Sequence, residues 1–497
     1  MIEHTAEAGY GPMDEVCNIT QVIETRALQH PAALALILPD RLVSYRELVS
    51  AVHVIARQLL ASGVQPGQVV GVSMGQTALH LTALLAIARI GAVSVPVHPA
   101  LTLERRELAA RRFGASAIVS GRSDLRIEGL PFIMLRAVDL AASAPTPPPV
   151  RTRAHDPCWI SLSSGTSGDP KGVLRSHGYM LDRVPKSTYS RTRESRLLPM
   201  DLNFGIGFGQ SMRMLVSGGA VVLAPDNLPA NLAYMVRSHA VTHWLLSPAL
   251  ADDILLCLDD DDVHFPSVVS LQIVGASPSP RLLDALFKKF TPNVNVNYGT
   301  SEVGPVAAAT PEILHRAPTS VGAIMPWVKL EIVDSLHQPV PTGQTGRMRL
   351  KMDGMFNGYH LDPELTAERF HEGWYYPQDS AWLDAEGLLY IDGREDDVLV
   401  VGGGKIYFRE IETALESHPS VREAAAFVLA NSAGRDSLAV AVVLSNPEAV
   451  DALMAWAAKK LGPICPEQLV VADNLPRTAT GKVLRDQLAK SVAPKPV

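Results

Sequence analysis

From about Val43 to Asn297 the sequence alternates short, wholly apolar runs with longer segments that repeat apolar residues at the helical period. Continuous apolar runs suit strands buried on both faces, and their alternation with helices predicts a mostly parallel β-sheet covered by helices. The expected fold class is therefore α/β. The predicted strands are Val69–Val72, Cys158–Leu162, Val221–Leu223, Thr242–Leu246 and Leu271–Val274, and the predicted helices include Leu103–Phe113, Asn231–His239 and Pro280–Phe290.

The pattern changes twice along the rest of the chain. Lys329–Leu350 is strand-rich and punctuated by Gly and Pro, which predicts a small antiparallel, β-barrel-like subdomain. Near Gly393 a charged stretch leads into a Gly run and a compact order of helices and strands. Residues 1–394 are therefore predicted to form a large N-terminal domain of layered α/β subdomains, and residues 395–497 a small α+β C-terminal domain.

Charge and hydropathy exclude several classes of protein. The formal net charge is −7 and aromatic residues make up 6% of the chain, so neither a basic face nor a base-stacking platform for nucleic acid is indicated. The most apolar long window, Ala78–Val97, changes its period halfway and contains charged, Gly and Pro residues. It predicts a buried helix (Leu79–Ile90) and a buried strand (Ala92–Val97) rather than a membrane span.

The cysteines indicate a reducing compartment. They are widely spaced, form no C-x-x-C pair and are too few for a disulfide framework in a chain of 497 residues. The N-terminal stretch has no apolar segment of the kind found in signal peptides, so a cytoplasmic protein is predicted. Each cysteine is expected to act as a small buried apolar residue: Cys17, Cys158, Cys257 and Cys465.

The stretch Ser161–Gly172 (SLSSGTSGDPKG) carries the strongest chemical signal. Small hydroxyl and Gly residues allow a tight turn whose N–H groups converge on an anion, and Lys171 adds a full positive charge. A Walker A loop requires Gly-Lys-Ser/Thr, whereas here Pro170 precedes the lysine, so a P-loop NTPase is excluded. On composition alone, a phosphate-binding loop and a plain Ser/Gly surface loop both stay open.

As a pattern, this stretch resembles the phosphate loop of the AMP-forming adenylating enzymes, the superfamily of acyl- and aryl-CoA synthetases, nonribosomal peptide adenylation domains and firefly-type luciferases. Four further segments resemble the remaining signatures of that superfamily and follow its order. They are NYGTSE at Asn297–Glu302, GWYYPQD at Gly373–Asp379, GREDD at Gly393–Asp397 and PRTATGK at Pro476–Lys482. The resemblance extends from about Val22 to Leu488, nearly the whole chain.

The resemblance implies an ATP site. Tyr298 would offer its ring face to the adenine, Asp379 would accept both ribose hydroxyls, and Arg394 would donate to the ribose or its phosphate. The residues implied to bind the nucleotide are Ser163, Ser164, Gly165, Thr166, Ser167, Gly168, Lys171, Asn297, Tyr298, Gly299, Thr300, Ser301, Asp379, Arg394 and Lys482. Two positions depart from the family pattern: Ser301 replaces Thr, and Pro377-Gln378 replaces Thr-Gly and changes the turn before Asp379.

The resemblance also implies three catalytic groups. Glu302 would hold Mg²⁺, which usually takes one or two carboxylates together with substrate phosphates. Lys171 would sit on the phosphates, and Lys482 would enter the site during adenylation and contact the acyl carboxylate and the α-phosphate. Removing one such transition-state donor typically costs about 10²–10³ in rate.

The segment after Arg394 is implied to move. By resemblance, Asp396 is the hinge about which the C-terminal domain rotates after the first half-reaction, and hinges of this kind absorb large backbone changes at a few positions. The Gly run Gly402-Gly403-Gly404 would then close the tunnel for the thiol of pantetheine. As an alternative, the Gly run is a flexible hairpin turn.

The acyl pocket suggests an acid without an α-amine. Members that activate amino acids carry an Asp to pair with the substrate ammonium, and that position falls near Ile206, which cannot pair a charge; Asp201 is out of register. An aryl or a short to medium acyl acid is therefore predicted. The residues expected to line the pocket are Asn203, Phe204, Ile206, Phe208, Gly275, Ala276 and Ser277.

These features predict an AMP-forming acid–thiol ligase of the acyl-CoA synthetase type. A carboxylate would attack the α-phosphorus of MgATP, and a thiol would then attack the acyl-AMP. The implied cofactors are ATP, Mg²⁺ and CoA. Two alternatives stay open: a stand-alone enzyme that loads the acyl group onto a carrier-protein phosphopantetheine, and a non-catalytic relative that binds nucleotide.

Overall fold

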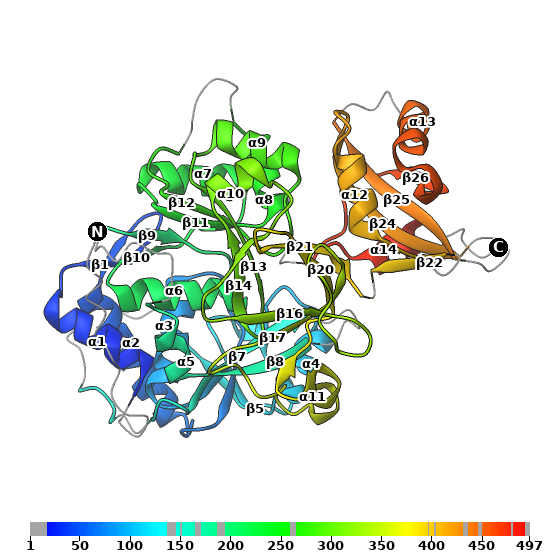
Figure 1. Ribbon diagram of the computed structural model, residues 1–497. Coiled ribbons are helices and arrows are strands. Elements are labelled where there is room, and N and C mark those ends of the chain that lie inside the picture. Colours follow the sequence, from blue (N-terminus) through cyan, green and yellow to red (C-terminus); the bar gives the residue numbers. More distant parts are fainter. Residues whose placement is uncertain are drawn as a thin grey trace. The chain divides into compact units, whose positions relative to one another are not determined.

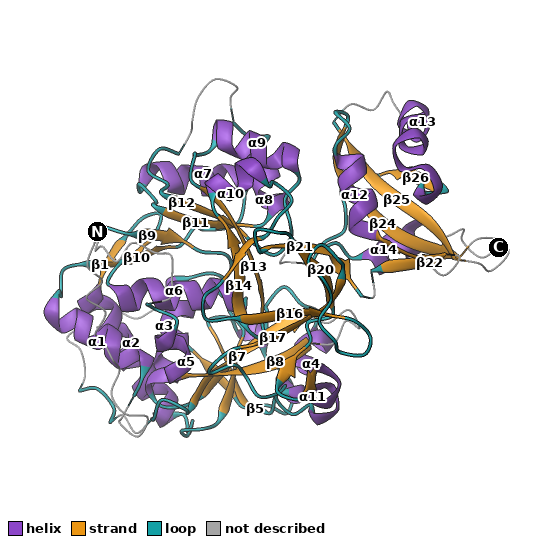
Figure 2. Cartoon of the chain, in the orientation of Figure 1, coloured by secondary structure: helices purple, strands orange, loops and turns teal. Residues whose placement is uncertain are grey.

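The computed structural model describes residues 17–136, 146–149, 152–164, 170–185, 194–258, 265–395, 397–401, 404–430, 436–445, 450–478 and 481–492 (Figure 1; Figure 2). The chain divides into two compact units, Met1–Trp244 with Phe356–Leu365 and Leu245–Met355 with Thr366–Val497. They are called the first unit and the second unit below.

The first unit contains a mostly parallel sheet with the strand order β6-β5-β3-β4-β7-β8. Neighbouring strands run parallel except for the last pair, in which β7 and β8 form an antiparallel hairpin. Because such a sheet is buried on both faces, β4 is buried throughout and packs in one core with Phe113 and Ile118. The strands are β3 (Val69–Val72), β4 (Val93–Pro96), β5 (Ala115–Ser120), β6 (Phe132–Met134), β7 (Pro157–Ser164) and β8 (Pro170–Ser176).

Helices with clear start signals accompany this sheet. Ser44 caps α2 (Tyr45–Ala61) in a capping box with Glu47, and Thr77 caps α3 (Ala78–Arg89). Helix α3 is buried from His80 to its end and leads to β4, so the prediction of a buried helix and strand in this apolar window is confirmed. In the part of the chain that is described, a helix both long and apolar enough for a bilayer is not found. The same sheet is accompanied by α4 (Leu103–Arg112) and η1 (Ser123–Leu125).

A second layer of the first unit is built from short strands in the order β9-β10-β1-β2. Strands β9, β10 and β1 are parallel, and β2 pairs antiparallel at the edge. Strand β11 (His243–Leu246) pairs with β9 and ends in the second unit. The elements are α1 (Ile19–Gln29), β1 (Leu34–Ile37), β2 (Leu42–Ser44), α5 (His177–Asp182), β9 (Arg196–Leu198), α6 (Gly205–Ser217), β10 (Ala220–Val222) and α7 (Pro229–Ser238).

The second unit turns from parallel to antiparallel pairing at β13. Its strand order is β18-β19-β17-β20-β21-β15-β14-β13-β12, with β16 also on β17. Strands β12 and β13 are parallel, and β14 onward are antiparallel. The elements are α8 (Pro248–Leu255), β12 (Ser270–Ile273), α9 (Pro280–Lys289), β13 (Val294–Thr300), β14 (Gly304–Ala309), α10 (Pro311–Arg316), β15 (Gly322–Ile324), β16 (Lys329–Val333), β17 (Gly346–Lys351), β18 (Phe370–His371), β19 (Trp374–Tyr375), β20 (Asp379–Leu383) and β21 (Leu388–Arg394). Helix α11 (Pro363–Arg369) begins in the first unit and ends in the second.

The C-terminal region of the second unit has its own sheet and core. Strand order is β24-β25-β26, with β22 and β23 as a separate hairpin. One face packs α12 and α13 around Ile411, Leu415 and Leu453, and the other packs α14 through Leu488 (Figure 2). The elements are β22 (Val398–Val401), β23 (Gly404–Tyr407), α12 (Phe408–Glu416), β24 (Val421–Ala430), β25 (Asp436–Leu444), α13 (Val450–Leu461), η3 (Gly462–Ile464), β26 (Gln468–Val471) and α14 (Arg485–Val492).

The predicted α/β class, with a large N-terminal and a small C-terminal domain, is confirmed. The antiparallel prediction for Lys329–Leu350 is confirmed by the β16–β17 ladder. All four cysteines are free of disulfides, but the expectation of burial is confirmed in full only for Cys158: Cys17 and Cys465 are partly buried, and Cys257 is exposed in the turn after α8. Cys158 is buried in β7, and burial raises the pKa of its thiol to about 12.

Candidate active site

The predicted phosphate loop lies between β7 and β8, which pair antiparallel in the first unit. In the ladder Ser163 pairs with Lys171, and Ser164 pairs with Pro170. Gly165, Thr166, Ser167 and Gly168 lie outside the described residues. The two strands thus carry the flanks of the loop, a hydroxyl on one side and Lys171 on the other.

The predicted adenine segment is the β13–turn–β14 corner of the second unit. Asn297 Nδ2 donates to Gln272 Oε1 at 3.0 Å, and Thr300 Oγ1 accepts from the Val303 amide at 3.1 Å. A side chain at Gly299 would meet the Gly304 carbonyl at 2.4 Å, so glycine is needed for the close approach of the two strands. The Thr300 side chain therefore stabilises the turn between β13 and β14 through its hydrogen bond with Val303.

The substituted residue of this corner, Ser301, begins the turn that presents Glu302. Glu302 is buried, at 6% exposure. Its negative charge acts on two neighbours, because it contributes to the raised pKa values of Tyr298 and Asp379. Ser301 thus occupies a turn position and leaves Glu302 beside Asp379.

Tyr298, Asp379 and Arg394 form a connected group. Tyr298 Oη donates to Asp379 Oδ2 at 2.5 Å, and Arg394 Nη1 lies 3.8 Å from Asp379 Oδ1. The β20–β21 ladder pairs Asp379 directly with Arg394. The arginine of β21 is therefore placed opposite the carboxylate by a backbone ladder, and the tyrosine of β13 reaches it through its side chain.

The charge state of Asp379 reflects this setting. Burial raises the pKa of Asp379, while Arg394, the Tyr298 hydroxyl and Lys482 each oppose the rise. Burial and the neighbouring carboxylate raise the pKa of Tyr298 well above its ordinary value, so the phenol stays protonated and donates. The group offers a carboxylate with defined donors, which suits the recognition of sugar hydroxyls.

The Pro377-Gln378 departure places a non-glycine residue in a left-handed backbone conformation. Gln378 has φ +64°, the left-handed region in which glycine is favoured, and its carbonyl accepts from the Glu395 amide at 2.9 Å. Its side chain adds a contact, because Arg394 Nη2 donates to Gln378 Oε1 at 3.3 Å. Gln378 is therefore less suited than glycine to this backbone conformation, but its side chain gives Arg394 a polar partner.

Lys482 closes a tight turn before α14. Thr478 N donates to the Lys482 carbonyl at 2.7 Å, and Arg477 Nη1 donates to the Gly481 carbonyl at 2.7 Å. Gly481 has φ +86°, and a side chain there would lie 3.0 Å from Ser247 Cβ. The lysine side chain is exposed, and its charge lowers the pKa of Asp379.

The predicted pocket residues are divided between the two units. In the first unit, Asn203 and Phe204 precede α6, and Ile206 lies in its first turn. Phe208 is buried edge-on against Trp159 of β7, with ring centroids 4.9 Å apart. In the second unit, Gly275, Ala276 and Ser277 follow β12, with Gly275 at φ +89°, and the Ser277 carbonyl accepts from Arg409 at 3.4 Å.

Sequence reasoning missed a polar pair beside these pocket residues. Asp201 Oδ1 accepts from the Asn203 amide at 2.8 Å, and Asp201 Oδ2 lies 3.5 Å from His98 Nε2. Burial works to raise the pKa of Asp201, but its His98 and Asn203 partners lower it below the ordinary value. His98 lies on the segment after β4, and no spacing in the sequence links that segment to Asp201.

The remaining predicted residues lie at or beyond the ends of described segments. Hinge residue Asp396 and tunnel residues Gly402 and Gly403 are outside the described residues, and Gly404 begins β23. Among the described residues, three or more His, Cys, Asp or Glu side chains do not gather into a metal cluster. A buried single carboxylate, Glu302, nevertheless fits a Mg²⁺ ion that takes its other ligands from phosphates and water.

Comparison with known proteins gives two family matches and several long alignments. The chain matches the family described as AMP-binding enzyme over residues 23–360, and the AMP-binding enzyme C-terminal domain over residues 410–482. Phosphinothricin tripeptide synthetase PhsC of Streptomyces viridochromogenes is 30% identical over 497 residues, 95% of this chain and 45% of the synthetase. Indoleacetate–CoA ligase of Aromatoleum aromaticum is 27% identical over 504 residues, 96% of this chain and 98% of the ligase.

Among solved structures, the amide bond synthetase McbA from Marinactinospora thermotolerans aligns with a TM-score of 0.84 and 25% identity. The alignment covers 95% of this chain and 99% of McbA. The chain spans less than half the length of the peptide synthetases that it matches.

Proposed function

The chain belongs to the AMP-binding enzyme family, as its motifs predict, and from this premise we propose that it activates a carboxylic acid with ATP to an acyl-AMP and pyrophosphate. The observation that carries the proposal lies in the second unit. There the charges of Lys482 and Glu302 both act on Asp379, which itself holds Tyr298 and Arg394. Residues from three motifs thus converge on the carboxylate of a fourth.

In the first step a substrate carboxylate oxygen attacks the α-phosphorus of ATP, and the bond to the pyrophosphate oxygen breaks. We assign Tyr298, Asp379 and Arg394 to holding the nucleoside. Lys482 stabilises the charge that develops between the acid and the α-phosphate, and Lys171 with the loop after Ser163 binds the phosphates. Preorganised donors of this kind are usually the largest single contribution to a rate.

Glu302 would hold Mg²⁺. When bound, the ion neutralises charge on the phosphate oxygens of the nucleotide. Glu302 is buried just after β13, where its charge also acts on Asp379 and Tyr298, so its own contribution would be a carboxylate ligand on the side of the nucleotide site.

In the second step a thiol attacks the acyl carbon, a thioester forms and AMP leaves. We propose that the domain of residues 395–497 rotates about Asp396 between the steps, and that Gly402–Gly404 then faces the thiol. Strand β21 ends at Arg394, so the proposed hinge directly follows the last strand of the larger domain.

The proposed acid is an aryl or a short to medium acyl acid without an α-amine. Ile206 in the first turn of α6 offers no charge to an ammonium. Asp201, a carboxylate of the preceding segment, is already held by His98 and Asn203. The similarity to indoleacetate–CoA ligase and to 4-chlorobenzoate–CoA ligase supports an aryl acid.

CoA is the proposed thiol, because the chain aligns over 98% of a CoA ligase. The second candidate is loading of a carrier-protein phosphopantetheine, which the 30% identity to a peptide synthetase supports. A third reading, a non-catalytic nucleotide-binding protein, is opposed by the retained acidic and lysine residues.

One experiment separates these functions. Pyrophosphate release is measured with a panel of aryl, short and medium acyl acids, with and without CoA. The expected result is release with at least one acid and an acyl-CoA product. Release without thioester at saturating CoA would favour the carrier-protein ligase, and no release with any acid would favour the non-catalytic protein.

A further inference from the structure

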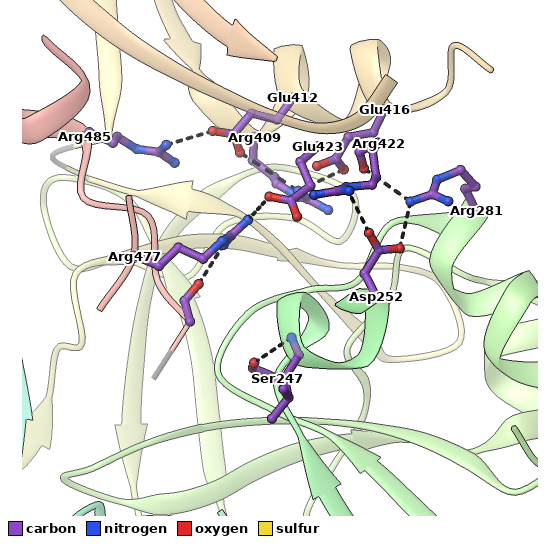
Figure 3. Close-up of polar contacts among 12 residues, drawn as sticks. Ser247, Asp252, Arg281, Arg409, Glu412, Glu416, Arg422, Glu423, Arg477 and Arg485 are labelled. Carbon is purple, nitrogen blue, oxygen red and sulfur yellow. Dashed lines mark hydrogen bonds and ion pairs between the residues drawn. The ribbon is translucent and has the colours of Figure 1, made fainter. Parts of the chain in front are cut away.

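Helix α8 contacts the C-terminal region at two points. At its start, Ser247 caps the helix by accepting from the Leu250 amide, and its side chain packs against the turn at Gly481. One turn into the helix, Asp252 pairs with Arg422 at the start of β24 (Figure 3). One short helix therefore meets the turn of Lys482 and the strand that supports it.

Asp252 lies between two arginines. Arg281 Nη2 of α9 donates to Asp252 Oδ1 at 3.0 Å, and Arg422 Nε lies 3.3 Å from Asp252 Oδ2. The Asp252 side chain is 7% exposed, and Arg281 also donates to the Arg422 carbonyl at 3.4 Å. Burial raises the pKa of Asp252, and both arginines oppose the rise. A buried carboxylate of this kind is expensive without its partners.

A chain of contacts leads from Arg422 to the lysine. The next residue, Glu423, accepts from Arg477 at 2.5 Å, and Arg477 donates to the carbonyl of Gly481 at 2.7 Å (Figure 3). Lys482 follows Gly481 directly. A shift of Arg422 would therefore be passed through Glu423 and Arg477 to the backbone that carries Lys482.

We propose that Asp252 is a positioning residue, which docks the C-terminal region through Arg422 and thereby sets Lys482 for acyl-AMP formation. This inference rests on the proposed function of Lys482. Asp252 itself touches neither substrate nor reacting atoms.

The contacts of Asp252 with Arg281 and Arg422 are suited to release of the C-terminal region as well as to its docking. The Arg281 contact has hydrogen-bond geometry, whereas the Arg422 contact at 3.3 Å is an ion pair without it. When Arg422 departs, Asp252 keeps a charged partner from α9 and is not left alone in a buried place. The hydrogen-bonded pair of Asp252 thus lies with Arg281 on the neighbouring helix α9, and the ion pair without hydrogen-bond geometry lies with Arg422 on the region proposed to move.

The test compares the two half-reactions in Asp252→Asn, Asp252→Glu and a control, Asp284→Asn. The control breaks an exposed pair of the same unit, Asp284–Lys288, at 2.7 Å. In Asp252→Asn, the kcat of pyrophosphate exchange is expected to fall about tenfold, the size of a typical coupling between sites, with the KM for ATP within about twofold. Transfer from chemically prepared acyl-AMP to CoA is expected to stay unchanged. The Glu variant should recover most of the exchange rate, and the control should match the wild type.

A label distance reports docking independently of catalysis. Spin labels at Glu312→Cys and Lys459→Cys, both exposed positions, are placed in a Cys257→Ser background, and the distance distribution is measured. Asp252→Asn and the partner variant Arg422→Gln should both broaden or shift it, and Asp284→Asn should not.

An unchanged label distance in both variants, or equal loss in the two half-reactions, would overturn the inference. If no acid is activated by the unmodified chain, the proposed function and the catalytic consequence fail together, while a shifted distance still supports docking by Asp252.

Discussion

Asp379 and Asp252 are both buried aspartates beside arginines in the second unit, with whole-residue exposures of 8% and 5%. Burial raises the pKa of each, and arginines oppose the rise in each. Their partners differ in how they are held. Asp379 faces Arg394 across a β-ladder, so backbone hydrogen bonds fix the pair. Asp252 faces Arg422 through side chains alone.

The difference fits the two proposed roles, nucleotide binding for Asp379 and docking for Asp252. A group that recognises a ligand gains from partners fixed in advance, because less freedom is lost on binding. A group that docks a mobile region needs one partner on the fixed body and one on the mobile region, and the second contact must be able to break. We call the group around Asp379 the nucleotide side and the group around Asp252 the docking side. Both pair an aspartate with arginines, but only on the nucleotide side does a backbone ladder hold an arginine opposite the aspartate.

The most severe break of the nucleotide side is Lys482→Ala. In the proposed mechanism the lysine stabilises the charge that develops, so the rate of acyl-AMP formation is expected to fall by about 10²–10³ while the KM for ATP changes much less. Stopped-time pyrophosphate release measures the rate, and equilibrium ATP binding serves as the control. Normal acyl-AMP formation in the variant would refute the role of Lys482.

The next break tests the fixed partners of Asp379. Losing a hydrogen bond to a charged group costs about 1.5–3 kcal/mol, so Tyr298→Phe should raise the KM for ATP by about tenfold or more, and Asp379→Asn should raise it further. Tyr390→Phe is a matched control, because Tyr390 also donates to a carboxylate, that of Asp384, at 3.2 Å. Equal effects of Tyr298→Phe and Tyr390→Phe would contradict a nucleotide role for Tyr298.

Parts of this arrangement could be predicted from the sequence, and others could not. The buried window Ala78–Val97 could be predicted as a helix and a strand because its hydrophobic period changes halfway. The structure has α3, capped by Thr77, and β4 there. Tyr298, Asp379 and Arg394 each stand in a motif, so the resemblance names them. Their mutual contacts could not be predicted, because the Asp379–Arg394 pair depends on the register of β20 with β21, and the Tyr298–Asp379 bond depends on tertiary packing.

The docking side has no such signal. Asp252 and Arg422 carry no motif, and in the sequence each looks like an ordinary surface charge of a helix or strand. Their pairing arises from tertiary packing of α8, α9 and β24, which no local periodicity encodes. The same limit hid the partnership of Asp201 with His98 in the first unit.

A smaller change, Gln378→Gly, tests what the departure from the family pattern contributes. A left-handed non-glycine residue costs about 1–2 kcal/mol, partly offset by the greater chain entropy of glycine, so thermal stability should rise slightly. The KM for ATP should nevertheless rise about two- to threefold, because Arg394 loses the weak Gln378 Oε1 contact. Glu372→Gly is the control, since Glu372 also has a positive φ, +51°; it should raise the Tm and leave the KM alone. A KM unchanged in both variants would show that Gln378 contributes backbone strain only.

The smallest expected effect concerns Glu416, a buried carboxylate in the C-terminal region whose ionisation should depend on pH. Glu416 of α12 lies 3.3 Å from Arg409, and burial raises its pKa from 4.5 to about 7, against the attraction of Arg409. The folded protein therefore binds more protons here than the unfolded chain between pH 4.5 and about 7, so ionisation of Glu416 lowers stability as the pH rises through this window. Glu416→Gln removes that titration, and its Tm relative to wild type should increase with pH across the window and level off above pH 7. A Glu416→Gln difference that stays constant across this window would contradict the prediction, because it would mean that folding does not change the pKa of Glu416.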